Sequence, residues 1–523
     1  KYNGNSPTGG SMSDDVVNYY ISSSRSISNG KLSFTPSYSA IDSSFRWPDC
    51  GFYKTGYICQ RYQLNMSGMM KYVPVGGNGC VSNPGYVIGT SNPSLTAIVE
   101  WTAVSQNISV RFGTSYKYYT YLPDAFNYAN SFKSTSDNFA VITILKPGLF
   151  VTSKCTVRSG GYVKLTTNGN YTLTRSFDGV MIDASSATLQ IGDKNSPTLT
   201  IDGTNRAYSL IYASTLYLYN VQMYGNAASS PVATKGPSFG GCAIVGELYM
   251  YDGTVISGFY SADTARGGGA IFGKDRATMY IYGGTIRSNK AAGYGGGIYI
   301  RNGYLYMSGN ALICGNSAAA GGGAAGIIDL VMADNAQIYN NNASYDAGGV
   351  LISRIATASD NAMIYGNTAG KNGGGIYFTN SKCYIEGISL SNNRAANGGG
   401  IYLSTSSSSV LTLTNCKITG NTATANGGGI YANNISLALN STTISGNSAV
   451  NGAGVYFADS TGNATLDVQC TISNNNASGD YGGGIYFANG KLVIKNSAIV
   501  NGNNASNGGG IYIASGTATM NDG

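Results

Sequence analysis

Hydrophobic and polar residues alternate in short runs along most of this 523-residue chain. In residues 216–219, 248–251 and 279–282 every second residue is aliphatic and the residues between are tyrosine. Period-two alternation over four to six residues, bounded by Gly, Asn and Ser, predicts short strands with one buried face. The spacing between runs leaves no room for a helix of about ten residues. The pattern therefore predicts an all-β protein.

Two linked motifs repeat through the second half of the chain. The first is Gly-Gly-x-Ile/Val, and its aliphatic residues are Ile244, Ile271, Ile298, Val350, Ile376, Ile401, Ile430, Val455, Ile485 and Ile511, with a degenerate copy near Ile327. Ten intervals span the 267 residues from Ile244 to Ile511, which gives a mean period of about 26.7 residues. The second motif is an aliphatic residue followed three positions later by an asparagine, and its asparagines are Asn289, Asn341, Asn367, Asn393, Asn421, Asn447 and Asn475.

Repeats of this length that contain only short strands predict a solenoid. Three strands per repeat, each paired with the same strand of the next repeat, form a parallel β-helix whose coils lie about 4.8 Å apart. Proline gives independent support, because it cannot donate a hydrogen bond to a strand ladder. All 11 prolines lie at or before Pro237, so the later repeats are free of them.

Composition divides the chain into three parts. Residues 1–120 hold both tryptophans and are predicted to form a β-rich head, with residues 97–112 as its clearest strand. Residues 121–138 are predicted to be a capping helix and linker, because Ala125, Phe126, Ala129 and Phe132 make one apolar stripe. Residues 139–523 are predicted to be the β-helix, with irregular coils to about residue 235 and regular repeats over 240–523.

Composition also limits the chemistry. The chain has no histidine, which excludes His-dependent catalysis and His-ligated metals, and the formal charge of +7 includes no Lys/Arg run that would follow a nucleic acid. We therefore expect no catalytic residue, metal or cofactor and no nucleic-acid partner. No apolar stretch is long enough to span a membrane.

The nine cysteines show no metal-ligand spacing. Cys416 and Cys470 are expected to occupy the same inward position two coils apart, beyond disulfide reach, as buried free thiols. Cys50, Cys59 and Cys80 are candidates for disulfides in the head, with Cys155 as a further candidate partner.

The repeated asparagines and tyrosines are the candidate functional positions. We interpret the asparagines as a structural ladder at a strand corner, where Asn hydrogen-bonds along the axis and tolerates a left-handed backbone. Outward tyrosines form long stripes that either stabilise the ladders by ring stacking or provide a face for ligand binding or assembly. They are Tyr217, Tyr219, Tyr249, Tyr251, Tyr280, Tyr282, Tyr299, Tyr306, Tyr377, Tyr402, Tyr431, Tyr456, Tyr486 and Tyr512.

The pairing of the two motifs, including the sequence Gly-Gly-Ala-Ile at 268–271, resembles the repeat of chlamydial-type polymorphic outer-membrane proteins. It is also similar to the right-handed parallel β-helix repeats of adhesin-like surface proteins from bacteria and methanogenic archaea. The resemblance covers about residues 140–523 and implies a right-handed β-helix at the cell surface or secreted. It implies adhesion to glycans or surface proteins.

Two alternatives remain beside adhesion. The chain stops where the next aliphatic-x-x-Asn strand should begin, so we expect either further sequence or a neighbouring subunit there, and few charges with outward tyrosines would suit a self-associating fibre. Parallel β-helices also carry polysaccharide lyases and hydrolases, which use clustered carboxylates. The acidic residues of the regular repeats are scattered, so we expect a non-enzymatic protein. A carbohydrate-active enzyme is the alternative.

Overall fold

The structure is a computed structural model. It describes seven strands between Gly10 and Ala103, and residues 106–521 except 205–207, 226–240, 266, 380–383, 405–409, 460–462, 464 and 496–497. The chain forms two compact units, Lys1–Gln106 and Asn107–Gly523. The boundary predicted near residue 120 therefore falls earlier, because the strands just after residue 106 pair with the β-helix.

The N-terminal unit is an antiparallel sheet of seven strands in the order β1-β4-β5-β7-β3-β2, with β6 paired to β5. These strands are β1 (Gly10–Ser11), β2 (Arg25–Ser28), β3 (Lys31–Phe34), β4 (Tyr53–Lys54), β5 (Tyr57–Met66), β6 (Met69–Pro74) and β7 (Leu95–Ala103). The single strand predicted over 97–112 is wrong, since it divides into β7 and β8 (Ile108–Phe112) in different units.

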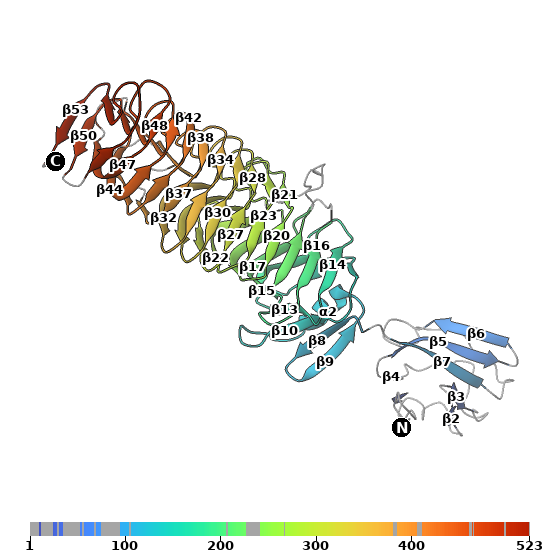
Figure 1. Ribbon diagram of the computed structural model, residues 1–523. Coiled ribbons are helices and arrows are strands. Elements are labelled where there is room, and N and C mark those ends of the chain that lie inside the picture. The colour runs from blue at the N-terminus through green and yellow to red at the C-terminus, as the bar shows by residue number, and fades with distance from the viewer. Residues whose placement is uncertain are drawn as a thin grey trace. The chain divides into compact units, whose positions relative to one another are not determined.

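The second unit begins with a cap. The hairpin of β8 and β9 (Ser115–Tyr119) pairs antiparallel with β10 (Ala140–Ile144) and so covers the edge of the first coil. The predicted helix is present as α2 (Leu122–Ala129) and buries Leu122, Ala125, Phe126 and Ala129 against this end (Figure 1). Phe132 lies beyond the helix, where its ring stacks on Phe112 at 4.6 Å.

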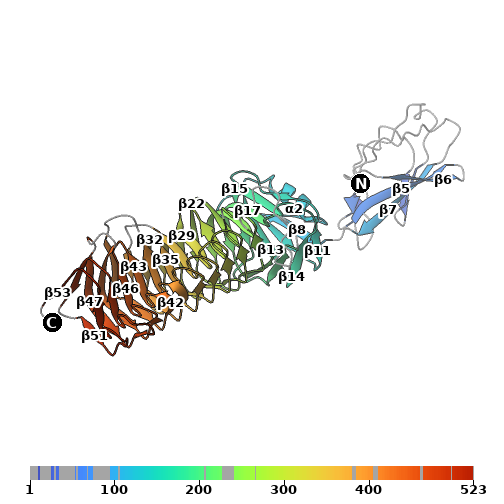
Figure 2. The same cartoon turned by 90° about the horizontal axis from the view of Figure 1, so that it is seen from above.

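From β10 onward the chain winds into coils whose strands pair in parallel with the equivalent strands of the next coil, and Figure 2 shows the same stack from above. Strands that follow the glycine motif form the first ladder, and the next two strands form the second and third ladders. The early coils contain β10, β11 (Leu149–Val151), β12 (Cys155–Thr156), β13 (Tyr162–Thr167), β14 (Tyr171–Arg175), β15 (Ile182–Ile191), β16 (Leu199–Asp202), β17 (Ile211–Leu218) and β18 (Val221–Tyr224).

Later coils follow the same plan with shorter strands. The first and second ladders continue in β19 (Ala243–Met250), β22 (Ile271–Ile281), β25 (Ile298–Ile300), β26 (Tyr304–Met307), β29 (Ala325–Met332), β32 (Val350–Ala358), β35 (Ile376–Phe378), β36 (Tyr384–Glu386), β39 (Ile401–Ser404), β40 (Val410–Thr414), β43 (Ile430–Asn433), β46 (Val455–Ala458), β49 (Ile485–Phe487), β50 (Lys491–Ile494), β52 (Ile511–Ile513) and β53 (Thr517–Met520). The third ladder contains β20 (Val255–Ser257), β23 (Thr285–Arg287), β27 (Leu312–Cys314), β30 (Gln337–Tyr339), β33 (Met363–Tyr365), β37 (Ser389–Ser391), β41 (Lys417–Thr419) and β51 (Ile499–Asn501), and β44 (Ser436–Ser445) and β47 (Thr465–Ser473) run through both the second and third ladders.

A fourth ladder was not predicted. Its nine strands form a separate parallel sheet: β21 (Tyr260–Ser261), β24 (Lys290–Ala291), β28 (Ser317–Ala318), β31 (Asn342–Ala343), β34 (Thr368–Ala369), β38 (Arg394–Asn397), β42 (Thr422–Asn426), β45 (Ser448–Ala449) and β48 (Asn476–Ala477). Most of these strands have only two residues, which is too short for period-two alternation to be visible in the sequence. The regular coil therefore has three longer strand positions and one short one.

The core runs along the inside of the coils. The inward residues of the first ladder are buried as predicted up to β49, including Phe378, Phe457 and Phe487, each at 0% exposure. In the last strand, β52, the inward position of Ile513 is 43% exposed. Two motif copies are out of register. Ala325, and not Ile327, pairs with Val350. Ala243, and not Ile244, pairs with Ile271. Ile244 instead shares the outward position of Phe272 and Tyr299.

The irregular early coils contain a buried cation. Arg175 is 2% exposed, and its guanidinium donates hydrogen bonds of 2.7–3.0 Å to the carbonyls of Gly179, Gly203 and Tyr208. These bonds fasten β14 to the segment that leads into β17. Arg175 therefore holds the coils together where the glycine and asparagine motifs are absent.

Among the described residues, Cys155, Cys242, Cys314, Cys416 and Cys470 are free thiols. The prediction for Cys416 and Cys470 is confirmed: both are buried, with Thr442 between them on the intervening coil. The suggested participation of Cys155 in a disulfide is wrong, because its side chain is buried in the core of the second unit. The side chains of Cys50, Cys59 and Cys80 lie outside the described residues.

Candidate functional site: an asparagine column, tyrosine columns and a polar hollow

The seven predicted asparagines lie in one column, meaning the same register position on successive coils. The column also contains Asn316 and Asn503, and eight of its nine members are at most 1% exposed. Each Nδ2 donates to the Oδ1 of the next asparagine at 2.9–3.0 Å, from Asn289 through to Asn503. The same Oδ1 accepts the backbone N–H of the preceding asparagine, as in the 2.9 Å bond from Asn393 to Asn421.

Each side chain also donates to a backbone carbonyl of the preceding coil, as Asn393 does to Ile364 at 3.1 Å. The buried amides are thus fully used by the fold, and the column leaves little polar surface for a ligand. Asn316 and Asn503 were not predicted, although Ile313 and Val500 precede them by three residues and complete the motif.

The left-handed backbone that we assigned to the column belongs to a neighbouring residue. The residue just before each column asparagine has φ between 52° and 65°. These residues are Ser288, Gly315, Asn340, Gly366, Asn392, Gly420, Gly446, Asn474 and Gly502. Glycine and asparagine dominate the set because they adopt this conformation at the lowest steric cost.

Thirteen of the fourteen predicted tyrosines fall into three columns of stacked rings. The first column is Tyr217, Tyr249, Tyr280 and Tyr306, with centroids 4.6–5.1 Å apart, and the second is Tyr219, Tyr251 and Tyr282, with centroids 4.1 and 5.4 Å apart. The third is Tyr377, Tyr402, Tyr431, Tyr456, Tyr486 and Tyr512, with centroids 4.6–5.5 Å apart. Tyr299 lies apart from the third column, because Gly326 and Leu351 occupy the register positions between it and Tyr377.

The stacking determines which part of each ring meets solvent. Aromatic rings are too wide to lie side by side when their centroids are only about 4–5.5 Å apart, so these rings overlap face to face with an offset. The columns therefore present ring edges and hydroxyl groups, and a free ring face remains only at the column ends. Most of these tyrosines are half-buried, and burial raises the pKa of Tyr249, Tyr377 and Tyr456 to about 12.

The first and second columns both begin at a polar hollow. Its volume is about 460 Å³, and it is lined by Ser136, Phe139, Tyr162, Thr188, Gln190, Thr215, Tyr217, Tyr219 and Glu247. Tyr162, Thr188, Thr215 and Glu247 are register partners on four successive coils. Two of the nine residues, Tyr217 and Tyr219, were predicted from the sequence, and no linear motif connects the others.

A turn next to the first coil forms one wall of the hollow. Thr135 and Asn138 exchange two backbone hydrogen bonds, so Ser136 lies at the tip of a tight turn. Ser134 Oγ accepts the backbone N–H of Tyr162 at 2.9 Å, and the Phe139 ring meets the Tyr162 ring edge-on at 5.7 Å. These contacts fix the wall against β13.

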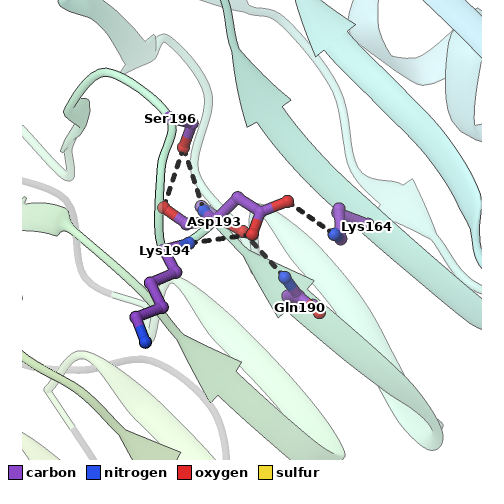
Figure 3. A network of polar contacts seen from close by, with 6 residues as sticks. Lys164, Gln190, Asp193, Lys194 and Ser196 are labelled. Atoms are coloured by element: carbon purple, nitrogen blue, oxygen red, sulfur yellow. Dashed lines mark hydrogen bonds and ion pairs between the residues drawn. The ribbon is translucent and has the colours of Figure 1, made fainter.

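A network of polar contacts lies beside the hollow (Figure 3). Lys164 pairs with Asp193 at 2.7 Å, and Gln190 Nε2 donates to the carbonyl of Gly192 at 3.0 Å. Ser196 Oγ both accepts the backbone N–H of Asp193 and donates to its carbonyl. The network therefore holds Gln190 in place and compensates the charge of Lys164.

Other candidate chemistry is sparse. Among the residues the structure describes, no group of three or more Cys, Asp or Glu side chains could hold a metal ion. Asp329 is buried in contact with Arg354, and Asp467 forms an ion pair with Lys495, so each carboxylate has a basic partner. No helix within the described ranges is long and apolar enough to cross a membrane.

Comparison with known proteins supports the fold. Residues 356–522 match the family model described as a right handed beta helix region. The coils from β10 onward, called the rod below, form a right-handed parallel β-helix. No curated protein and no solved structure matches the chain significantly. The match lies within the regular part of the β-helix, where the asparagine column and the third tyrosine column are located.

Proposed function

We propose that this chain is a non-enzymatic β-helix rod, secreted or displayed at a cell surface, that acts in adhesion to glycans or surface proteins. The observation that carries the proposal is the third tyrosine column, in which six hydroxyl-bearing ring edges repeat along one outward face. Repeats about 4.8 Å apart offer a periodic row of donors and acceptors to an extended ligand. The resemblance to adhesin-like repeats agrees with this role.

The distribution of acidic residues supports binding over cleavage. Hydrolysis by a pair of carboxylates needs two such groups about 5–9.5 Å apart on either side of a bond. The hollow has one carboxylate in its lining, Glu247. In the regular coils, Asp329 and Asp467 each form an ion pair with a basic residue.

The test compares two triple variants of the full chain. Replacing Tyr402, Tyr431 and Tyr456 by Ser removes the middle of the third column. The control replaces Thr419, Ser445 and Ser473 by Ala. These three residues are register partners on the third ladder, in the same coils as the three tyrosines. Labelled protein is applied to an array of plant, animal and microbial glycans, with light scattering and negative-stain electron microscopy in parallel.

We expect the wild type and the control to bind array members as monomers, and the tyrosine variant to lose that binding while keeping its circular dichroism spectrum. Equal binding by both variants would show that the third tyrosine column does not take part in glycan binding. Filaments of the wild type that disappear in the tyrosine variant would replace adhesion by fibre assembly.

A further inference from the structure

We propose that the hollow at the start of the first and second tyrosine columns is a binding site for a neutral oligosaccharide. The inference rests on the proposed function and assigns it a ligand class and a location. The hollow extends over four coils, which at about 4.8 Å per coil is roughly 14 Å along the axis. Its volume of about 460 Å³ lies within the usual range of small-molecule sites.

The aromatic residues of the hollow differ from those further along the columns. Tyr217 is the first ring of its column: Tyr249 stacks on one side, and the register position on the other side belongs to Gln190. Tyr219 likewise begins the second column. The ring faces of the first members are therefore not enclosed between two stacked tyrosines, and they can pack against the apolar face of a sugar ring.

The polar residues of the hollow supply both hydrogen-bond donors and acceptors. Ser136, Thr188 and Thr215 contribute hydroxyl groups, Gln190 an amide and Glu247 a carboxylate. Thr215 Oγ1 donates to Glu247 at 3.5 Å, so the carboxylate is oriented across the ladder. Mixed donors and acceptors beside aromatic rings suit the alternating hydroxyl groups and apolar faces of a saccharide.

Charge restricts the kind of sugar. Glu247 is the only charged residue in the lining, and the nearby Lys164 already pairs with Asp193. A uronic or sialic acid would meet a carboxylate without a compensating cation, which is unfavourable. A proline-rich peptide is a poorer match, because proline has no backbone N–H to donate to Glu247. The lining thus favours a neutral saccharide.

The experiment titrates the full chain with neutral hexasaccharides of β-1,4-linked glucose, mannose or N-acetylglucosamine by isothermal titration calorimetry. Hexagalacturonate and a proline decamer are the comparison ligands. We expect at least one neutral hexamer to bind and both comparison ligands to bind much more weakly. Binding of the proline decamer alone, or of none of the neutral hexamers, would overturn the proposal.

Matched variants locate the site. Tyr217→Ser removes the first ring of the first column and should weaken binding about tenfold or more. Tyr306→Ser removes the last ring of the same column, which also has one stacked column neighbour, at 5.1 Å, but does not line the hollow. This control should change the affinity less than about twofold. Equal losses in the two variants would contradict the location.

Two further measurements keep the result interpretable. Gln190→Ala tests the site without disturbing a stacked ring and should also weaken binding, provided that the melting temperature is unchanged. Glycan-array binding that survives Tyr217→Ser but is lost in the Tyr402, Tyr431 and Tyr456 variant would leave the proposed function standing and remove the hollow from it. Release of shorter sugars from a bound hexamer would overturn the proposed non-enzymatic function.

Discussion

Each regular coil requires a left-handed backbone at defined residues. One is the residue before the column asparagine, and another is the first residue of the glycine motif, such as Gly295, Gly373 or Gly427. Ala347 takes the latter role with φ of 56° although it carries a Cβ atom. That conformation costs an L-residue about 1–2 kcal/mol. The motif positions are therefore set by backbone geometry and not by contact with a ligand.

The asparagine column allows a test at a single residue. Asn393→Ala removes the acceptor of the Asn367 backbone N–H and of Asn367 Nδ2, and also the donor to the Ile364 carbonyl. Because these groups are buried, the free energy of unfolding should fall by about 3 kcal/mol. Urea denaturation of the full chain, followed by circular dichroism, measures this change.

The control is an asparagine on the surface of the same region. Asn361 is exposed, and its Nδ2 donates to Asn335 at 3.2 Å. Asn361→Ala should change the free energy of unfolding by less than about 0.5 kcal/mol. Similar denaturation midpoints for the two variants would mean that the column contributes little to stability.

At the scale of elements, the fourth ladder explains the repeated glycines. An alanine that is at most 4% exposed occupies the second position of eight fourth-ladder strands. These strands are β24, β28, β31, β34, β38, β42, β45 and β48. The glycine motif of the same coil runs directly against this strand. A Cβ atom on Gly399 would lie 2.6 Å from the carbonyl oxygen of Thr422 and 2.5 Å from that of Gly428. Small residues on both sides are therefore a packing requirement.

Gly399→Ala should accordingly destabilise the chain by about 2 kcal/mol, because backbone atoms that cannot move away would be overlapped. Gly510→Ala is the control, since a Cβ atom there meets only Val500, at 3.6 Å. Thermal melting monitored by circular dichroism distinguishes them. Equal melting temperatures for Gly399→Ala and Gly510→Ala would contradict this prediction. They would show that the glycine motif and the fourth-ladder strand can move apart without loss of stability.

The sequence predicts the fold well because the repeat is visible in one dimension. Period-two alternation gives the longer strands, and the aliphatic-x-x-Asn motif gives the buried column. The fourth ladder is missed because its strands are too short for any period, and the copy at Ile244 is misaligned because alanine occupies its inward position. The hollow is missed because it joins a turn at Ser136 to side chains on four different coils.

For the whole rod, the stacked tyrosines predict instability in alkali. Burial raises the pKa of Tyr377 and Tyr456 to about 12, above the ordinary tyrosine value of 10.0. A group whose pKa is higher in the folded state stabilises the fold fully below the unfolded pKa, and this contribution is lost as pH rises through the folded pKa. The rod should therefore lose stability between about pH 10 and pH 12, as columns of neighbouring rings ionise together.

Tyrosinate absorbance and circular dichroism, recorded over the same pH titration, measure this effect. The variant with Tyr402, Tyr431 and Tyr456 replaced by Ser has fewer such rings and should lose less stability over the same range. Complete ionisation near pH 10 with an unchanged circular dichroism spectrum would contradict the prediction.

The asparagine column also has a direction. From Asn289 to Asn475, one hydrogen of each Nδ2 bonds to the Oδ1 of the next asparagine toward the C-terminal end, and from Asn316 to Asn503 each Oδ1 accepts from the N-terminal side. The other Nδ2 hydrogen bonds to a backbone carbonyl of the preceding coil. The side-chain carbonyls thus share one direction along the axis, and the Oδ1 of Asn289 places partial negative charge at the N-terminal end of the column. That end accepts the backbone N–H of Phe259 at 2.9 Å. The column is therefore a directional row of buried amides, and the backbone N–H of Phe259 caps its N-terminal end.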